Sequence, residues 1–315
     1  MTPDDLELRS LAPPVDAAFE AMTFPTYRRL LSLEPTVRHP EQGDARSIQP
    51  LAIGAFRAGR PVGLALAERP LADAAPAELL SLFVVESQRG AGVGGALVAA
   101  AEGELAAAGA AQVSATWTAG KPGIERVERI LERRGWSPPE TRTVSARFRP
   151  EAMLTLPLFS PRHLAALDPG FEIFPWYELP ADELARLRES NAARRWISDG
   201  LEPWSYGGGR AYDPATSVGA RYRGKVVGWV LTERIDGRLL RWTVSFLEKS
   251  LSRRGRIVPV YKASLERAVE ARYEFCLFVT PVRFPTMVRF IRRWISRRSE
   301  FVGETRGAVK RLAAP

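Results

Sequence analysis

The chain has 315 residues, of which 45% are hydrophobic and 26% charged, and it carries a net charge of +9. This length predicts about two globular domains with sizeable cores. The single cysteine, Cys276, excludes an internal disulfide, and two histidines argue against a Ser-His-Asp relay or a multi-histidine metal centre. No apolar run approaches the roughly 18 residues of a membrane span, and the N-terminus lacks a signal-peptide pattern. We expect a cytoplasmic protein that binds no metal and enters no membrane.

The positive charge is concentrated in the second half of the chain. Residues 1–150 carry 17 Lys and Arg against 18 Asp and Glu, a net charge of −1. Residues 151–315 carry 28 against 18, a net charge of +10. This asymmetry predicts two domains with different partners. A basic half attracts acidic ligands or nucleic acid, but a solvated, arginine-rich surface explains the same charge.

Strands and helices alternate in the first half. The hydrophobic patterns predict strands at 6–11, 51–58, 62–68, 77–85, 112–118 and 143–148, and helical segments at 15–33, 94–108 and 124–134. Pro25 interrupts the first helical segment. The turn Gly59-Arg60-Pro61 predicts that the second and third strands form a hairpin.

A glycine-rich loop carries the strongest functional signal. The strand at 77–85 leads into Arg89-Gly90-Ala91-Gly92-Val93-Gly94-Gly95, and an alanine-rich helix follows at once. Glycine tolerates positive φ and has no Cβ, so this backbone can turn tightly and approach a ligand. The unpaired N–H groups at the start of the helix, supported by its dipole, then face an anion. The sequence therefore predicts a phosphate-binding loop.

Two common phosphate-binding loops do not fit. A Walker A loop needs Lys-Ser or Lys-Thr after its last glycine, and Gly95-Ala96 stand there instead. Residues 90–95 match the dinucleotide pattern G-x-G-x-x-G literally. However, several predicted strands precede the loop, and the next strand, at 112–118, ends without the acidic residue that this pattern requires. The remaining alternative is an ordinary strand-to-helix turn without a ligand.

The segment from Gln88 to Gly94 resembles motif A of the GNAT (Gcn5-related N-acetyltransferase) superfamily, in which a splayed strand and the following helix hold the pyrophosphate of coenzyme A. The order of elements over residues 5–150 is similar to that fold as well. The resemblance implies an α+β (α/β) protein with a mixed, mostly antiparallel twisted sheet flanked by helices. It also implies acetyl-CoA as co-substrate. The residues that it assigns to the coenzyme are Phe83, Val84, Val85, Gln88, Arg89, Gly90, Ala91, Gly92, Val93, Gly94 and Gly95.

The same resemblance implies direct transfer of an acyl group to an amine. A backbone N–H around Val84-Val85 would stabilise the oxyanion, and a carboxylate would take the proton of the amine. Glu78, at the start of the strand, and Glu86, where the strand meets the loop, are the candidate bases. Each is otherwise a solvated carboxylate. The tyrosine that often serves as general acid in this family falls at Leu131, which cannot donate a proton.

The second half repeats the order of the first. Its predicted strands lie at 171–176, 217–222, 226–235, 239–247, 274–279 and 301–312, and its helices at 180–196, 261–273 and 285–295. When Arg254-Gly255 is aligned with Arg89-Gly90, Ile257 and Pro259 take the next two glycine positions. Ile257 blocks close approach of the backbone and Pro259 lacks an N–H, so we expect no coenzyme A here. A basic loop with Arg253, Arg254 and Arg256 remains a candidate for an acidic group.

We therefore predict a GNAT domain at 1–150, a linker at 151–170 and a degenerate GNAT-like domain at 171–315. The expected function is N-acylation of a small-molecule or protein amine by acetyl-CoA. Two alternatives stay open, namely a protein that binds or senses coenzyme A without turnover, and an acyltransferase directed to RNA or protein by the basic half. The arginine-rich helix at 289–298 fits RNA or an anionic membrane, but we expect its apolar side to be core. The glycine-rich loop at 204–212 is expected to be a flexible connection.

Overall fold

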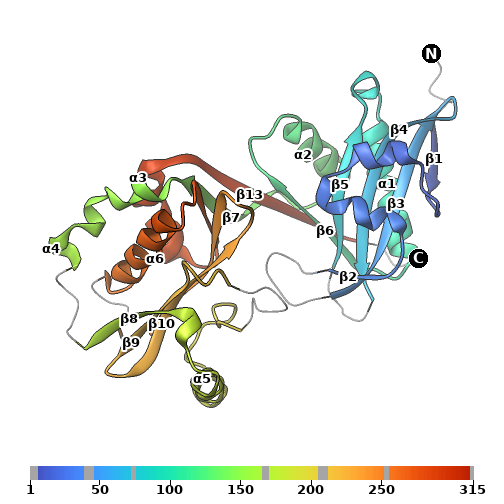
Figure 1. The fold of residues 1–315 in the computed structure, drawn as a ribbon. Coiled ribbons are helices and arrows are strands. Elements are labelled where there is room, and N and C mark those ends of the chain that lie inside the picture. The colour runs from blue at the N-terminus through green and yellow to red at the C-terminus, as the bar shows by residue number, and fades with distance from the viewer. Residues whose placement is uncertain are drawn as a thin grey trace. The chain divides into compact units, whose positions relative to one another are not determined.

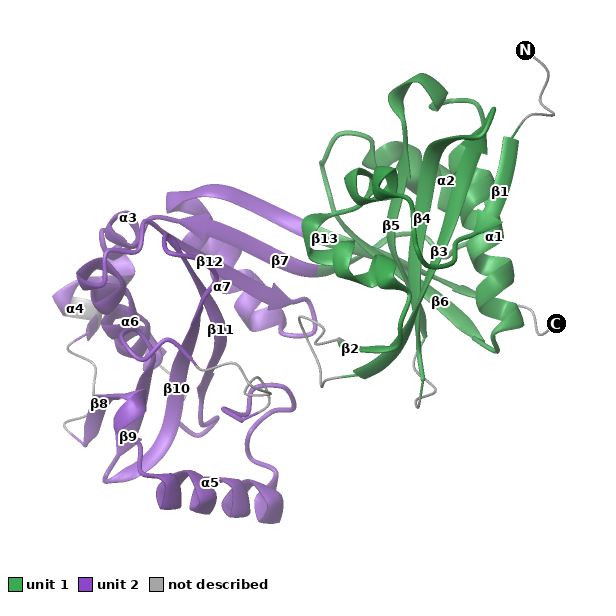
Figure 2. Ribbon diagram, turned by 45° about the vertical axis from the view of Figure 1, so that its right-hand side comes forward, with its two compact units in different colours: residues 1–40, 45–142, 305–315 green, residues 41–44, 143–304 purple. Residues whose placement is uncertain are grey.

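The computed structural model describes residues 6–38, 46–71, 76–164, 170–204, 212–251 and 255–312. The chain folds into two compact units (Figures 1 and 2). The first unit comprises residues 1–40, 45–142 and 305–315, and the second comprises residues 41–44 and 143–304. The last strand, β13 (Ser299–Arg311), thus begins in the second unit and ends in the first.

The first unit is a sheet with the strand order β1-β3-β4-β5-β6-β13, and β2 pairs with β3. Its other strands are β1 (Leu6–Ser10), β2 (Thr36–Arg38), β3 (Arg46–Arg57), β4 (Arg60–Pro70), β5 (Ala77–Val84) and β6 (Gln112–Thr118). Its helices are α1 (Val93–Ala107) and α2 (Ile124–Arg133), with the 3₁₀ helices η2 (Ala17–Met22), η3 (Pro25–Ser32) and η4 (Glu86–Gln88). β5 and β6 pair in parallel, and the other pairs are antiparallel.

Both faces of this sheet are covered. On one face, Val93, Leu97 and Leu105 of α1 pack against small and branched residues of β3 to β6. On the other face, residues of η2 and η3, including Phe19 and Leu30, pack against β4 and β5. A strand that is buried on both faces needs no alternation of polar residues, which explains the continuous apolar sequence 62–67 of β4.

The last strand is tied to the first unit by a buried carboxylate. Glu102 on α1 is only 6% exposed. It accepts hydrogen bonds from Arg134 Nη2 (2.6 Å), Trp136 Nε1 (2.7 Å) and Lys310 Nζ on β13 (2.6 Å). Burial by itself raises the pKa of Glu102, but these hydrogen bonds outweigh burial and hold the pKa below its ordinary value.

We expect Glu102→Gln to lower the free energy of unfolding by about 3 kcal/mol, because two cations would lose their partner in a buried site. The pKa of Glu102 is lower in the folded state than in the unfolded state. Its stabilisation is therefore complete above the unfolded-state pKa and is lost as the pH falls through the folded-state pKa. Urea unfolding at a series of pH values measures both effects. Glu104→Gln, at an exposed position of the same helix, is the control. If the free energy of unfolding of Glu102→Gln fell at acid pH as steeply as that of the wild type, Glu102 would not be the source of the acid sensitivity.

The second unit is a sheet with the strand order β13-β7-β12-β11-β10-β9-β8, in which β11 and β12 are parallel. Its strands besides β13 are β7 (Glu140–Phe148), β8 (Phe171–Pro175), β9 (Val218–Tyr222), β10 (Lys225–Arg234), β11 (Leu239–Leu247) and β12 (Phe275–Pro281). Its α-helices are α3 (Pro150–Leu154), α4 (Pro161–Leu164), α5 (Ala181–Arg194), α6 (Val258–Glu270) and α7 (Pro285–Arg293). The 3₁₀ helices are η5 (Pro157–Phe159), η6 (Trp176–Glu178) and η8 (Ile295–Arg298).

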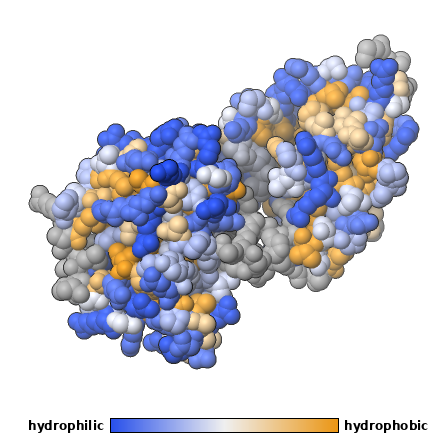
Figure 3. All heavy atoms as spheres, in the orientation of Figure 1, coloured by the Kyte–Doolittle hydropathy of each residue, from blue (hydrophilic) through white to orange (hydrophobic). Residues whose placement is uncertain are grey.

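The predicted fold class is confirmed, since each unit is a mixed, mostly antiparallel sheet flanked by helices. The face of the molecule seen in Figure 3 mixes hydrophilic and hydrophobic side chains. None of the helices in the described parts of the chain is both long and apolar enough to cross a membrane.

Candidate functional site

β5 and β6 separate part-way along their length. Their parallel pairing covers only Ala77–Leu79 with Val113–Ala115. Beyond that point β5 continues to Val84 beside β4, while β6 continues to Thr118 beside β13. We call the region between the diverging carboxyl ends of β5 and β6 the crevice. In open sheets with parallel strands, ligands often bind at such carboxyl ends.

A β-bulge marks the point of separation. Leu66 of β4 lies opposite Ser81 and Ala67 lies opposite Leu79, so Leu80 is an extra residue in β5. Bulges of this kind redirect side chains and are common beside active sites. The hydrophobic pattern of β5 gave no indication of this bulge.

Glu78 lies two residues before the bulge and is half-buried. It stands directly opposite Glu68 of β4 and beside Ser114 of β6. Side chains of directly opposed residues share one face of the sheet, so the two carboxylates lie on the same face. Glu68 is only 7% exposed. The sequence analysis did not identify it as a candidate, because it directly continues the apolar sequence of β4.

The amides at the end of β5 differ in what they can bind. The N–H of Val85 donates to the carbonyl of Val62 (3.0 Å) and is therefore engaged by β4. Neighbouring residues of a strand direct their N–H groups to opposite sides, so the N–H of Val84 points away from β4, toward the crevice. The carbonyl of Val84 accepts a hydrogen bond from Arg89 Nε (3.0 Å). Of Val84 and Val85, only Val84 therefore has an N–H that faces the crevice.

The glycine-rich loop forms an open cradle at the start of α1. Gly90 and Gly92 have φ of 87° and 82°, in the region that glycine tolerates best. The first hydrogen bond of α1 runs from Ala96 N–H to the carbonyl of Gly92 (3.1 Å), so the three preceding helical N–H groups have no acceptor within the helix. No side chain caps this end, and the first turn has no acidic residue. The cradle therefore presents free donors and the positive end of the helix dipole.

The four glycines of the loop have different surroundings. A Cβ built on Gly90, Gly92 or Gly95 would meet no atom within 4 Å, so these positions border open space. A Cβ on Gly94 would lie only 3.0 Å from Ile130 Cδ1. The absence of a side chain at Gly94 therefore allows α1 to pack closely on α2. Side chains at the open positions would fill the cradle. This geometry fits a phosphate group bound by the backbone.

The other predicted residues lie at different distances from this cradle. Glu86 lies in η4 and is exposed, and Gln88 beside it is half-buried. Glu78 lies six residues before Val84, about 20 Å along the strand. The structure therefore brings Glu86 to the cradle and Glu78 to the far end of the crevice. Leu131 is 1% exposed and belongs to the core beneath α1.

Trp117 lies on β6 two residues after Ala115, the last residue of β6 that pairs with β5. Its indole N–H donates to Glu128 Oε1 on α2 (3.0 Å), and Arg306 Nη1 on β13 donates to the same oxygen (3.3 Å). These contacts fix the Trp117 ring between α2 and the last strand. The residues that support this side of the crevice therefore come from distant parts of the sequence.

Comparison with known proteins agrees with this geometry. Residues 18–129 match the model of the family described as "Acetyltransferase (GNAT) family". The solved structure of a tandem GNAT protein from the clavulanic acid biosynthesis pathway aligns with a TM-score of 0.61 at 17% identity, covering 98% of this chain and 99% of that one. A GCN5-related N-acetyltransferase from Sphaerobacter thermophilus aligns with a TM-score of 0.58 at 16% identity, covering 99% and 97%. The GNAT family model thus matches part of the first unit, and the chain as a whole has the fold of these two solved structures.

A third similar structure is the glucosamine N-acetyltransferase region of a fungal multi-domain GH3 β-N-acetylglucosaminidase, with a TM-score of 0.61 at 14% identity. The alignment covers 98% of this chain and 38% of the fungal chain. Comparison with curated proteins gives no match. The glycine-rich loop and most of the crevice lie inside the residues that match the family model.

In the second unit the corresponding strands also separate. β11 and β12 pair over Leu239–Trp242 and Phe275–Phe278, and β11 then continues to Leu247. Here, however, aromatic rings pack together beside the last residues of this pairing. Trp242 stacks on Tyr261 at 4.9 Å, and Phe278 meets the edge of Trp242 at 5.3 Å. Tyr261 is 1% exposed and donates to Ser245 Oγ (2.6 Å).

The parallel strand pairs of the two units, β5–β6 and β11–β12, differ in the size of the residues at which their pairing ends. In the first unit the last residues paired are Leu79 and Ala115, whereas in the second they are Trp242 and Phe278. The helix that follows, α6, has Ile257 as N-cap and a proline in its first turn. Arg253 and Arg254 of the predicted basic loop lie outside the described residues, and Arg256 is half-buried.

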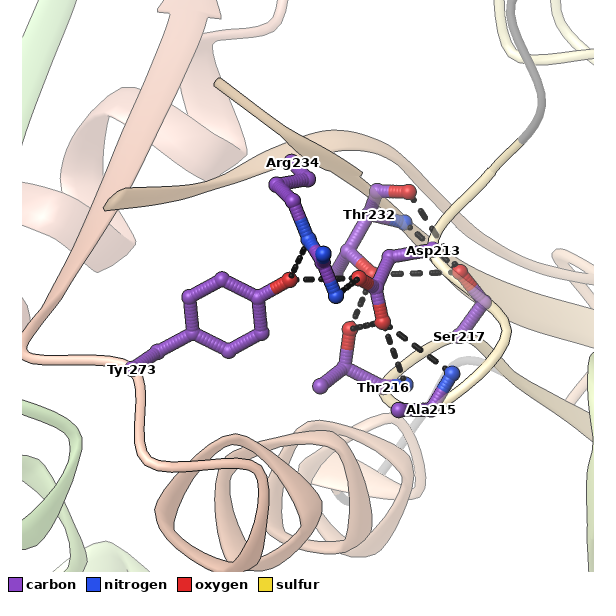
Figure 4. Close-up of polar contacts among 7 residues, drawn as sticks. All are labelled: Asp213, Ala215, Thr216, Ser217, Thr232, Arg234 and Tyr273. Carbon is purple, nitrogen blue, oxygen red and sulfur yellow. Dashed lines mark hydrogen bonds and ion pairs between the residues drawn. The ribbon is translucent and has the colours of Figure 1, made fainter. Parts of the chain in front are cut away.

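A buried polar cluster in the second unit was not found from the sequence (Figure 4). The side chain of Asp213 is 1% exposed. Its Oδ1 accepts from the N–H groups of Ala215 (3.0 Å) and Thr216 (3.1 Å), and its Oδ2 accepts from the hydroxyl of Tyr273 and from Arg234 Nη2 (3.5 Å). Both oxygens are thus engaged by the chain itself, so the cluster fixes the turn before β9. In the glycine-rich loop that precedes it, residues 205–211 lie outside the described residues.

Proposed function

We propose that this protein is an acetyl-CoA-dependent N-acyltransferase whose first unit binds the coenzyme and transfers its acyl group to an amine. The observation that supports this most strongly is the uncapped, glycine-lined start of α1 at the crevice between β5 and β6. Free N–H groups and a helix dipole favour a dianionic pyrophosphate there. The residues proposed to hold it are those of the loop from Gln88 to Gly95, with Phe83, Val84 and Val85 at the strand end.

The residues of the crevice can take the remaining roles. Acetyl-CoA would supply an acetyl group activated as a thioester. The amine nitrogen would bond to the carbonyl carbon as the C–S bond breaks, and the departing thiolate of coenzyme A would take a proton from solvent. The Val84 N–H would stabilise the negative charge that develops on the carbonyl oxygen of the thioester. Glu78, half-buried beside the bulge and about 20 Å along β5 from Val84, would accept the proton of the attacking amine through a chain of water molecules. Glu86 is the alternative base at the other end of β5.

A second candidate function follows from Leu131. Its position in the core leaves no proton donor at the place where this family often has a tyrosine. A protein that binds coenzyme A as a sensor needs no such donor. Consumption of acetyl-CoA with a panel of small-molecule and protein amines tests the enzyme. Saturable acetyl-CoA binding without consumption across that panel would replace the enzyme by the sensor.

We expect one molecule of coenzyme A per chain, bound by the first unit. Large rings, those of Trp242, Tyr261 and Phe278, pack beside the point where β11 and β12 separate, and Pro259 removes a helix N–H that could bind phosphate. Isothermal titration calorimetry of the full chain measures the stoichiometry. Two sites per chain, or one site that survives when the first cradle is blocked, would contradict this prediction.

A further inference from the structure

The second unit carries an arginine-rich surface that the proposed acetyl transfer does not use. It is formed by α7, η8 and the residues just before α7. Its exposed arginines are Arg283, Arg289, Arg292, Arg293, Arg297 and Arg298. No acidic residue occurs in the sequence between Arg283 and Ser299. Together these six side chains form what we call the arginine surface.

These arginines remain available to an anion. Arg292 forms an ion pair with Glu304 (3.2 Å), but both side chains are exposed, at 62% and 36%. Exposed pairs of this kind are weak and do not prevent competition by a ligand. Arg289 donates to a hydroxyl of Thr286. Within the described residues, Arg293, Arg297 and Arg298 form no ion pair with a carboxylate.

Two aromatic rings lie among these arginines. A shallow hollow of 550 Å³ is lined by Thr286, Arg289, Phe290, Arg292, Arg293 and Trp294. Phe290 and Trp294 are four residues apart and share one side of the helix. Both are half-buried against the core, so their positions are fixed while part of each ring stays accessible. The Arg293 guanidinium lies 5.3 Å from the centre of the Trp294 ring.

This arrangement suits a nucleic acid better than a lipid surface. A membrane-binding helix inserts its apolar face into the lipid. The apolar side of this segment, with Ile291 and Ile295, is fully buried in the core and cannot insert. Single-stranded nucleic acids instead combine phosphates, which arginines bind, with flat bases, which stack on aromatic rings. The rings in the hollow and the arginines around it match both parts.

We propose that α7 and η8 form a binding surface for single-stranded nucleic acid. The guanidinium groups bind consecutive phosphates, and an unpaired base stacks on the accessible ring of Trp294 or Phe290. This surface belongs to the second unit, and its test does not depend on acetyl transfer.

The first experiment measures binding of a fluorescein-labelled oligouridine to the full chain by fluorescence anisotropy at several salt concentrations. The triple variant Arg289→Gln/Arg293→Gln/Arg297→Gln should weaken binding at least about tenfold and reduce the slope of log Kd against log salt by about 2, since each lost phosphate contact contributes about 0.7. The matched control is Arg186→Gln/Arg188→Gln/Arg194→Gln, which removes the same charge from exposed positions of α5, where acidic residues are interspersed. Equal weakening in both variants would overturn the proposal.

The second experiment separates stacking from charge. Trp294→Leu keeps every arginine and an apolar side chain at a half-buried position. It should weaken oligouridine binding by about fivefold to a hundredfold, the usual contribution of one stacked base, and leave binding of inorganic polyphosphate unchanged. Equal losses for both probes would overturn the proposal. So would tighter binding to phosphatidylserine vesicles than to oligouridine.

Discussion

Replacing Gly92 with valine should abolish coenzyme A binding and leave the fold intact. Gly92 caps α1 at a φ of 82°, and its missing Cβ keeps the cradle open. A branched side chain there would displace the phosphate from the helix N–H groups. The loss of two charge-assisted hydrogen bonds costs about 3–6 kcal/mol, which is more than a hundredfold in Kd. Calorimetry with coenzyme A measures the affinity, and circular dichroism checks the fold.

Gly59→Val provides a matched control. Gly59 has a φ of 72° in the turn between β3 and β4, and a Cβ there would also meet no atom within 4 Å. Both substitutions therefore carry a similar backbone strain of about 1–3 kcal/mol, but only Gly92 borders the cradle. Unchanged coenzyme A affinity in a folded Gly92→Val protein would refute the assignment of the loop. A similar loss of affinity in Gly59→Val would trace the effect to instability.

Glu78→Gln should lower kcat by about 10²–10⁴-fold, the usual contribution of one positioned acid–base group. The amide keeps the shape of the side chain and loses the ability to accept a proton. The affinity for acetyl-CoA should change little, because Glu78 lies about 20 Å along β5 from the strand end beside the cradle. Steady-state kinetics with an accepted amine, together with calorimetry of acetyl-CoA binding, separate these two effects.

Glu86→Gln is the control for this experiment, because Glu86 is exposed in η4 at the other end of β5. We expect its kcat to stay within about threefold of the wild type, in contrast to the effect of a positioned base. Full activity in Glu78→Gln and a large loss in Glu86→Gln would exchange the two roles. Full activity in both variants would remove both carboxylates from the mechanism.

Local patterns were sufficient to predict most elements of the fold. The strand at 112–118 coincides with β6, and the helix at 94–108 lies within one residue of α1. Both hairpins of the pattern strand–turn–strand occur, with Ala58-Gly59 and Arg223-Gly224 at positive φ in their turns. These signals depend on neighbouring residues only, since hydrophobic periodicity and turn residues act within a few positions.

The geometry of the candidate site needed more than local patterns. The bulge at Leu80 and the opposition of Glu68 and Glu78 depend on the register between β4 and β5. Register results from the packing of whole strands, so no single segment encodes it. The sequence therefore indicated Glu78 as a candidate but not the second carboxylate beside it.

By itself, the sequence determined the glycine-rich loop, the alternation of strands and helices, and the substitution of Leu131 for a proton donor. Only the tertiary structure showed which strand the last strand, β13, pairs with in the first unit. Residues 305–311 of β13 pair with β6, and Lys310 donates to Glu102, 208 residues earlier. It also decided that Trp242, Tyr261 and Phe278, which come from three separate elements, pack together in the core of the second unit. Such contacts form only when the hydrophobic core brings distant segments together, and their partners leave no mark on the local sequence.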